Sequence, residues 1–546
     1  MQKTLTALLP KPVLPAVPIA ALFFIASLTP SLVPRETLVQ ALLSGVSLLA
    51  GYAVGLAISF LWHRLELPVA RAKWQMRLRL LTGLLCLLAA GIALWLASDW
   101  QNGLRALLAM PPVETARPFS IALGALAVFL LVLWVLRLAG LFMQRLAAGI
   151  ARVLPGPQAA LISILLTAIL FWNIGNGVII RNTLGFFDRV YAGLDELFDE
   201  ASPRPQDPLK TGAEGSLIEW ESLGRMGRAM IAAAPDQARI TALTGAEAME
   251  PLRVYVGLNS APDPAERAQL ALAELRRIDA FSRSTLVIAT PTGTGRVDPA
   301  GQQALEYLLG GDVATVSVQY SYVASWIALL TDSEYGMETA REVFSAVYDH
   351  WRSLPRAERP ALYLNGLSLG ALNSDLSHDL HQVVSDPFNG ALWVGPPFSS
   401  PTWQEVTRNR NRGSPAWLPD YRDGSAVRFM NQTGLTSRVS ARWGGFRILY
   451  LQHASDAVVF FDPRATWRRP PWMSAPRGPD VSPEFRWLPV VTVLQLAVDT
   501  MTAVKPPAGF GHTYDFATYA RAWAMLLDLP DWPQERIDAL VEARGR

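Results

Sequence analysis

The segment Gly366-Leu367-Ser368-Leu369-Gly370 has the G-x-S-x-G spacing that can make a serine nucleophilic. Such a serine lies on a sharp turn between a strand and a helix, and the two small glycines let the strand and helix approach each other. The helix N-terminus behind the turn favours negative charge. The alternative interpretation is a serine that only caps the following helix. We interpret Ser368 as a candidate nucleophile.

A serine hydroxyl needs a base to remove its proton, and a histidine is the usual choice. In enzymes with this turn, the base follows both the serine and the acid along the chain. His512, in the loop Gly509-Phe510-Gly511-His512, is placed well downstream, before a final helical stretch. The other five histidines precede the serine, lie on the helix after it, or fall close behind the last strand: His63, His350, His378, His381 and His453. The sequence therefore favours His512 as the base.

The acid of such a site should follow a strand, so that its carboxylate reaches the imidazole and fixes the tautomer. Asp456 meets this condition, because it comes directly after the apolar run FRILYLQ and lies between Ser368 and His512. Asp462 is the main rival, and Asp499 on a probable helix is a weaker one. We interpret Asp456 as the acid.

The oxyanion of an acyl-transfer intermediate is best stabilised by backbone N–H groups that are already in place. Leu369, the residue after the nucleophile, should supply one of them. The second should come from the glycine-rich segment TPTGTG, where Thr292 or Gly293 is favoured. The same segment could be a phosphate-binding loop, but it lacks the Lys-Ser/Thr ending of a P-loop.

The elements that must position these residues are readable from Pro251 onward. Short β-branched runs alternate with helical periodicity, a pattern typical of a mostly parallel sheet with helices on both faces. The strands are expected at 252–258, 284–290, 313–320, 361–368, 391–395 and 446–452. Two further segments, 396–445 and 463–495, are rich in Trp, Arg and Pro and are interpreted as a cap over the site.

The first third of the chain is apolar and predicts a membrane domain. Five runs are long enough to cross a bilayer as helices: 13–33, 38–62, 80–98, 118–138 and 158–180. The first run is alternatively a signal peptide. Lys and Arg concentrate before the first run, between the second and third, and around the fourth-to-fifth connection, so these loops should stay in the cytoplasm. The rest of the chain would then lie on the far side of the membrane.

Length and composition bound the remaining possibilities. The 546 residues suggest three parts: a transmembrane domain at 1–181, an amphipathic linker at 182–248 and a catalytic domain at 249–546. A net charge of +2 gives no nucleic-acid footprint. The single cysteine, Cys86, excludes an intrachain disulfide. There is no metal-ligand cluster and no dinucleotide fingerprint, so neither a metal nor another cofactor is expected. The sequence carries no signal for the oligomeric state.

The segments GLSLG, YLQHASD, TPTGTGRVDP, VQYSYVASW and GFGH together resemble a bacterial membrane-anchored α/β-hydrolase family with a multi-span N-terminal domain. The resemblance covers nearly the whole chain. It implies Ser368, Asp456 and His512 as nucleophile, acid and base, in agreement with the interpretation above. With the distribution of Lys and Arg, we expect a multi-pass protein of the bacterial cytoplasmic (inner) membrane whose catalytic domain lies on the periplasmic (extracytoplasmic) side.

The substrate is inferred from the surroundings of the site. Tyr320, Tyr322 and Trp326 follow a strand end and are candidate substrate-binding residues, although such aromatics more often serve packing. A tethered esterase with an apolar cap fits lipid or acylated substrates. The chain is thus expected to be a serine hydrolase that cleaves carboxylic esters. An acyltransferase with the same acyl-serine intermediate and a non-catalytic membrane scaffold are the alternatives.

Overall fold

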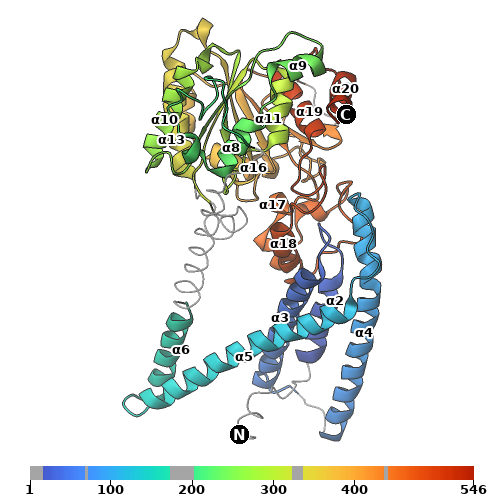
Figure 1. Cartoon of the computed structure of the whole chain (residues 1–546). Helices are drawn as coiled ribbons and strands as arrows, with labels where there is room; N and C mark the ends of the chain where they lie inside the picture. The colour runs from blue at the N-terminus through green and yellow to red at the C-terminus, as the bar shows by residue number, and fades with distance from the viewer. Residues whose placement is uncertain (1–15, 68–71, 173–201, 323–335, 436–440, 546) are drawn as a thin grey trace. The chain divides into compact units, whose positions relative to one another are not determined.

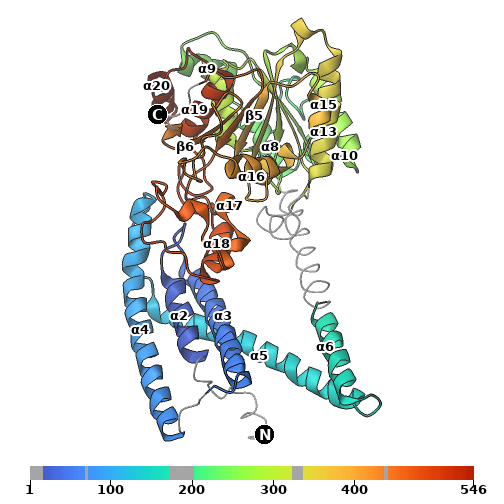
Figure 2. The same cartoon turned by 180° about the vertical axis from the view of Figure 1, so that it is seen from behind.

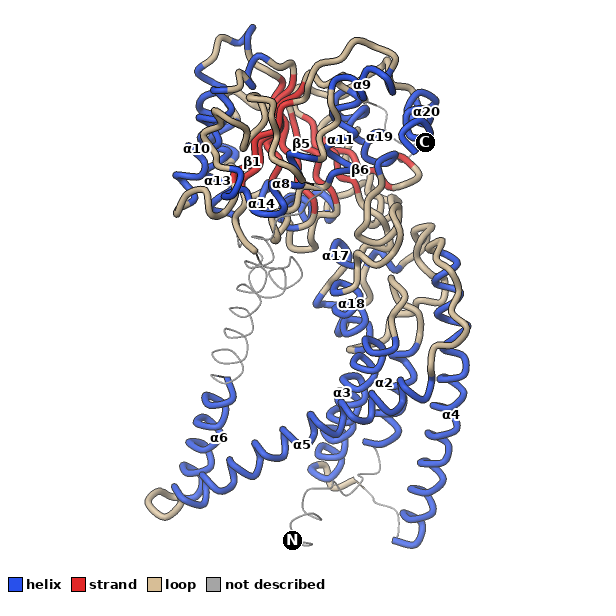
Figure 3. The backbone as a smooth tube through the Cα atoms, viewed as in Figure 1, coloured by secondary structure: helices blue, strands red, loops and turns tan. Residues whose placement is uncertain are grey.

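The computed structural model describes residues 16–67, 72–172, 202–322, 336–435 and 441–545 (Figure 1). The chain forms two units, and each draws on separated parts of the sequence. The first unit contains 1–185, 462–473 and 481–502, and the second contains 186–461, 474–480 and 503–546. The second unit carries the sheet (Figure 3).

The sheet of the second unit has eight strands in the order β1-β3-β2-β4-β5-β8-β6-β7. All neighbours pair in parallel except β6 and β7, which form an antiparallel pair. The strands are β1 (Leu252–Val256), β2 (Thr285–Thr290), β3 (Val313–Val318), β4 (Ala361–Leu367), β5 (Gly390–Val394), β6 (Val427–Asn431), β7 (Gly434–Leu435) and β8 (Arg447–Leu451). The six strands expected from the sequence correspond to β1 to β5 and β8. The α/β architecture expected for this half of the chain is therefore present.

Strands β6 and β7 lie within the segment that the sequence analysis interpreted as a cap. Residues Val427 to Met430 pair with Ile448 to Leu451 of β8, so β6 extends the sheet beyond β8 although it precedes β8 in the chain. Buried Phe429 stacks on buried Tyr450 at 4.8 Å between ring centroids. This part of the segment is consequently a sheet element.

Helices cover both faces of the sheet (Figures 1 and 2). On one face, α10 and α13 pack against each other, and α14 follows β4. On the other, α11 packs on α19, and both contribute to a core with α9 and α20. The helices of this unit are α8 (Gly224–Ala232), α9 (Gln237–Thr244), α10 (Pro264–Arg277), α11 (Pro299–Leu308), α13 (Met337–Ser353), α14 (Leu369–Asp375), α15 (Leu380–Val383), α16 (Pro401–Arg408), α17 (Ala457–Phe460), α19 (Phe516–Leu527) and α20 (Gln534–Gly545).

Among its described residues, the first unit has three helices long and apolar enough to cross a membrane: α3 (Thr37–Arg64), Met76–Leu107 within α4 (Ala72–Leu107), and α5 (Pro118–Ile150). Helices α2 (Ala16–Leu28) and α6 (Gly156–Trp172) correspond to the first and fifth expected runs but are shorter. Parts of those two runs, 13–15 and 173–180, fall outside the described residues. Three spans are thus supported, and the five-span count stays a prediction.

Small residues let the helices of the first unit pack closely. A Cβ added at Gly55 of α3 would lie 2.3 Å from the Cα of Ala16, and one at Gly45 would lie 2.6 Å from the Cβ of Val128. Close backbone approach through glycine is a common way for apolar helices to associate in lipid. Helix α3 therefore packs on both α2 and α5.

Helix α18 (Val491–Met501), which begins inside the expected cap segment 463–495 and extends beyond it, belongs to this first unit. Its Asp499 accepts hydrogen bonds from the hydroxyl of Ser31 and the amide of Leu32, both at 2.9 Å. The Nε of Arg35 lies 3.3 Å from Asp499 Oδ1, and both side chains are fully buried. A segment near the C-terminus is thereby anchored to the loop between α2 and α3.

Candidate active site

Ser368 lies at the sharp turn between β4 and α14. Its backbone has φ 58° and ψ −127°, a conformation that costs a non-glycine residue about 1–3 kcal/mol. A Cβ at Gly366 would lie 2.3 Å from the carbonyl carbon of Gly370, and one at Gly370 would lie 2.3 Å from the oxygen of Thr290. Both flanking positions of the motif therefore have to be glycine for strand, helix and neighbouring loop to meet.

His512 and Asp456 are in direct contact. The imidazole Nδ1 lies 2.6 Å from Asp456 Oδ2, and the other carboxylate oxygen accepts the amide of Val458 at 2.9 Å. Asp456 follows β8 and is the N-cap of the short helix α17. The carboxylate is completely buried, and the histidine is 8% exposed. This contact fixes Nδ1 as the protonated nitrogen and leaves Nε2 as the basic one.

The imidazole of His512 lies at the end of the strand beside the serine. The amide of Ser368 donates to the carbonyl of Val394 at 3.0 Å. A Cβ on the next residue, Gly395, would lie 2.7 Å from Cε1 of His512. Buried Nε2 of His512 has no hydrogen-bond partner among the residues that the structure describes, Ser368 included. Catalytic hydrogen bonds often tighten only when a substrate is bound.

Tyr514 contacts Asp456, and this contact was not predicted from the sequence. Its hydroxyl donates to Asp456 Oδ2 at 2.7 Å, the same oxygen that contacts His512. Burial, together with the adjacent carboxylate, holds the pKa of Tyr514 well above its usual range. The phenol therefore stays protonated and remains a donor. Its position two residues after His512 was the only signal in the sequence.

The His512 loop is held by a second set of hydrogen bonds from the loop after β8. The Nδ1 of His453 lies 2.9 Å from the carbonyl oxygen of Gly511, and the amide of Gly511 donates to the hydroxyl of Ser455 at 2.9 Å. That hydroxyl donates to buried Asp480 at 2.5 Å. Burial lowers the pKa of His453, so its ring is neutral and Nδ1 carries the donated proton.

The two rival acids have other partners. Asp462 accepts the amide of Arg464 at 2.9 Å as the N-cap of a 3-10 helix, Pro463–Thr466. Asp499 is engaged by Arg35, Ser31 and Leu32, as described above. Of the three candidate carboxylates, Asp456 is the one hydrogen-bonded to His512.

The expected oxyanion donors lie near the serine, with one complication. Leu369 is the first residue of α14, and its amide has no hydrogen-bond partner among the described residues. The amide of Thr292, by contrast, donates to the carbonyl of Arg296 at 2.9 Å. The loop itself contacts the elbow, since Gly370 approaches the oxygens of Thr290 and Pro291. Thr292 and Gly293 are the two candidates for the second oxyanion donor, and the backbone N–H of Thr292 is already hydrogen-bonded.

The expected substrate-binding aromatics differ in their surroundings. Tyr320 is buried, and its ring packs against Gly336. The hydroxyl of Tyr322 donates to Asn259 at 2.9 Å, beyond the end of edge strand β1 and therefore away from β4. Trp326 lies outside the described residues. Substrate binding by these three aromatics stays a prediction.

Comparisons with known proteins address the family to which the chain belongs. A family model described as "Alpha/beta-hydrolase family" matches residues 252–540, more than half of the chain. The chain belongs to the alpha/beta-hydrolase family. A second model, described as the N-terminus of an alpha/beta-hydrolase family, matches residues 28–235, so the apolar helices of this hydrolase are part of the family pattern.

Other comparisons add little to the family assignment. A search of curated proteins found no match. One solved structure, from work titled "LipS and LipT, two metagenome-derived lipolytic enzymes increase the diversity of known lipase and esterase families", is 17% identical over 34% of this chain and 78% of its own. Its TM-score is 0.17, too low to support a conclusion about fold or function.

Proposed function

We propose that this alpha/beta-hydrolase is a serine esterase in which Ser368 is the nucleophile, His512 the base and Asp456 the acid. The observation that carries the proposal is the geometry of His512. One ring nitrogen contacts a buried carboxylate, while the other is buried without a partner among the described residues, beside the strained serine turn. This is the arrangement that a proton-shuttling imidazole requires.

In the first half-reaction, Ser368 Oγ attacks the carbonyl carbon of an ester while His512 Nε2 accepts the hydroxyl proton. The negative charge moves to the carbonyl oxygen, which the amide of Leu369 and a second donor from the Thr292–Gly293 turn would stabilise. The intermediate collapses, the ester C–O bond breaks, and His512 returns its proton to the departing alcohol. An acyl-serine remains.

In the second half-reaction, a water molecule attacks the acyl-serine carbonyl and gives its proton to His512. Collapse releases a carboxylic acid and restores the Ser368 hydroxyl with that proton. Asp456 stays ionised throughout and stabilises the imidazolium. Tyr514 and the amide of Val458 support the charge of Asp456 by hydrogen bonding.

The proposed substrates are lipid or other acyl esters, and the proposed site of action is a bacterial inner membrane. The three long apolar helices and the family match of residues 28–235 support membrane association. The distribution of Lys and Arg between the apolar runs favours a catalytic unit on the periplasmic side.

The test uses the full chain in detergent or nanodiscs with a fluorophosphonate probe and a chromogenic acyl ester. Wild type should be labelled and should release free acid, and Ser368→Ala should lose both. Ser282→Ala, at an exposed serine of the same unit, is the matched control. Failure of the folded wild type to react with the probe would contradict the proposal and favour a scaffold. Ester release that rises with added alcohols, at the expense of free acid, would favour acyl transfer.

A further inference from the structure

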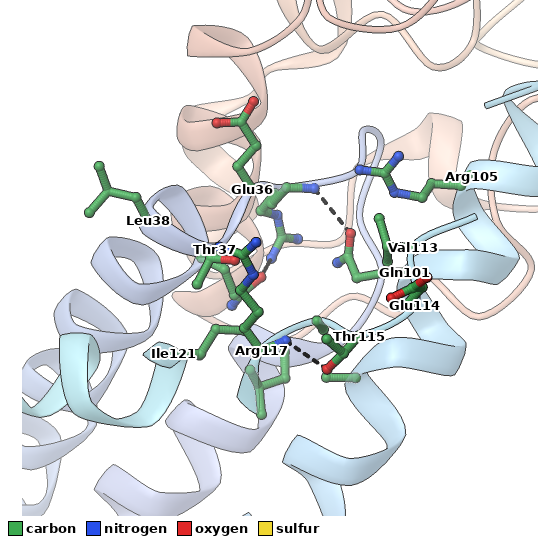
Figure 4. Close-up of a pocket in the computed structure, with 15 residues that line it drawn as sticks. Glu36, Thr37, Leu38, Gln101, Arg105, Val113, Glu114, Thr115, Arg117 and Ile121 are labelled. Carbon is green, nitrogen blue, oxygen red and sulfur yellow. Dashed lines mark hydrogen bonds between the residues drawn. The ribbon is translucent and has the colours of Figure 1, made fainter. Parts of the chain in front are cut away.

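A cavity of about 610 Å³ opens within the first unit, and none of its lining residues belongs to the proposed catalytic site (Figure 4). It is lined by the N-terminus of α3, the C-terminal part of α4, the segment 113–117 and the start of α5. Because α3, α4 and α5 are the helices long enough to span a membrane, a cavity at their shared ends would lie at the depth of lipid headgroups.

The inner wall presents a hydrogen-bond donor whose orientation is fixed. Gln101 is 6% exposed, and its Oε1 accepts the amide of Arg35 at 3.1 Å. Because a backbone N–H can only donate, the oxygen of the amide must face Arg35 and the NH₂ group must face the other way. Figure 4 shows this group turned to the cavity, where Nε2 has no hydrogen-bond partner among the described residues.

Two arginines add positive charge at the same cavity. Arg105 donates one hydrogen bond, from Nη1 to the carbonyl of Pro111 at 3.2 Å, and Arg117 is exposed at the start of α5. Neither forms an ion pair within the described part of the chain. Arg35 is different, because Asp499, Ser31, Gln40 and two carbonyls occupy its guanidinium.

The helix ends reinforce this donor set. Thr37, the first residue of α3, and Arg117, the residue before α5, line the cavity, and neither helix has a side-chain N-cap. Unsatisfied N–H groups and the helix dipole favour an anion such as phosphate at these positions. Gln101, Arg105 and Arg117 line the same cavity, so its donors and positive charges suit an anionic group.

Carboxylates and apolar side chains lie at the rim of the cavity. Glu36 and Glu114 are both exposed and both line it, so a ligand with several negative charges would be repelled. A headgroup with one phosphodiester and one ammonium matches both signs of charge. Leu38, which lines the cavity and is 81% exposed, is a suitable contact for an acyl chain next to such a headgroup.

We propose that this cavity binds the headgroup of a membrane phospholipid with a primary ammonium, of the phosphatidylethanolamine type. The phosphodiester is held by Gln101 Nε2, Arg105 and Arg117, and the ammonium lies near Glu114. This lipid site is separate from Ser368, and it stands whether or not the chain hydrolyses esters.

The test is native mass spectrometry of the full chain, titrated with phosphatidylethanolamine, its phosphatidylcholine analogue, phosphatidylglycerol, and free phosphoethanolamine as competitor. Phosphatidylethanolamine should bind at least tenfold more tightly than either other lipid, and the free headgroup should not displace it at equal concentration. Equal binding of the three lipids would overturn the proposal. Displacement by free phosphoethanolamine would overturn it in favour of a soluble phosphate ligand. The titration with the three lipids and the competition with free phosphoethanolamine both use the unaltered chain.

Two variants locate the site. Gln101→Glu keeps an acceptor for the Arg35 amide but turns an anionic oxygen to the cavity, and Arg117→Asn removes an exposed cation at a position with φ 52° that asparagine tolerates. Each should weaken phosphatidylethanolamine binding about tenfold. Arg152→Asn, at the exposed loop after the other end of α5, should leave it unchanged. Unchanged binding in both site variants, with both folded, would contradict the assignment.

Discussion

The hydroxyl of Tyr514 and the imidazole of His512 contact the same oxygen of Asp456, at 2.7 Å and 2.6 Å. The carboxylate of the proposed site therefore has a second side-chain donor, and this donor lies two residues from the base. Tyr514 also stacks on His453, at 4.2 Å between ring centroids, which links it to the contacts that hold the His512 loop. We regard Tyr514 as a positioning residue for the proposed reaction.

Replacing Tyr514 by Phe should lower kcat/KM about tenfold while leaving the fold intact, because one hydrogen bond to a charged group is lost. Without the Tyr514 hydroxyl, the carboxylate of Asp456 would stabilise the protonated imidazole more strongly, so the acidic limb of the pH profile of kcat/KM should move to higher pH. The measurement is kcat/KM against pH. Tyr348→Phe, which removes a buried hydroxyl bonded to the carbonyl of Asp386 at 2.6 Å, is the control. An identical pH profile for Tyr514→Phe and wild type would exclude the positioning role.

Asp456→Asn should reduce kcat by about 10²- to 10⁴-fold, because an amide can place its NH₂ group toward Nδ1 and leave His512 in the wrong tautomer. Asp462→Asn should retain near-normal activity, since Asp462 only caps a 3-10 helix. Steady-state kinetics on both variants discriminates between the two carboxylates. A larger loss in Asp462→Asn than in Asp456→Asn would reverse the assignment of the acid.

Gly395→Ala should displace the base, because its Cβ would lie 2.7 Å from Cε1 of His512. A misplacement of about 1 Å at a catalytic group costs roughly 10²-fold in rate. Gly245→Ala is a matched control, since Gly245 also has positive φ (70°, against 51° for Gly395) but nothing lies within 4 Å of the added atom. Gly395→Ala should lose activity in the esterase assay, and Gly245→Ala should keep it.

The stability of the second unit should depend on pH through His378, whose ring packs on Phe344 and Phe388. Burial lowers its pKa from 6.5 to about 4. The folded state thus favours the neutral ring, so the stabilisation is complete above pH 6.5 and is lost as the pH falls toward 4. His378→Phe should remove this loss, roughly 1–3 kcal/mol.

Thermal denaturation of wild type and His378→Phe between pH 4 and 7 checks the effect of His378. Asp375, whose pKa is raised to about 6 by burial, titrates with the opposite sign, but it is present in both proteins and cancels in the comparison. Parallel curves for the two proteins across this range would show that His378 does not titrate as expected.

Asp499→Ala should destabilise the first unit by about 3–5 kcal/mol, because it leaves the charge of Arg35 buried without its carboxylate. Adding Arg35→Met should recover much of the loss. Glu405→Ala, which breaks an ion pair with Arg408 that is 63% exposed on both sides, should cost less than about 1 kcal/mol. Denaturation of each variant in detergent measures these changes in the free energy of unfolding. A double variant less stable than Asp499→Ala would refute the idea that an unpaired charge is the cause.

The sequence predicted the parts of the fold that local pattern controls. The elbow at Ser368 is visible because its two glycines are required by backbone contacts within a few residues, and six strands are visible as short β-branched runs. The His512–Asp456 contact is consistent with the chain order, since Asp456 follows a recognisable strand and His512 comes before the final helical stretch. Whether these residues catalyse ester hydrolysis remains the proposal tested above.

Other features depend on partners distant in sequence. Strand β6, VRFMN, contains Arg and Asn and precedes the strand it pairs with, so it reads as part of a loop until β8 is in place. The start of helix α18 was expected to belong to a cap. Its attachment to the first unit depends on the ion pair of Asp499 with Arg35, which is distant in sequence. The sequence does not distinguish Tyr514 from other aromatic residues, because its hydrogen bond to Asp456 is visible only in the structure.

The buried pair of Arg35 and Asp499 joins residues 464 positions apart. A ribosome adds about 5–20 residues per second, so Asp499 is synthesised roughly 25 to 90 seconds after Arg35. During that time, the guanidinium of Arg35 must remain hydrated or form an ion pair with another group. The N-terminal helices thus complete their packing only after nearly all of the polypeptide has been made.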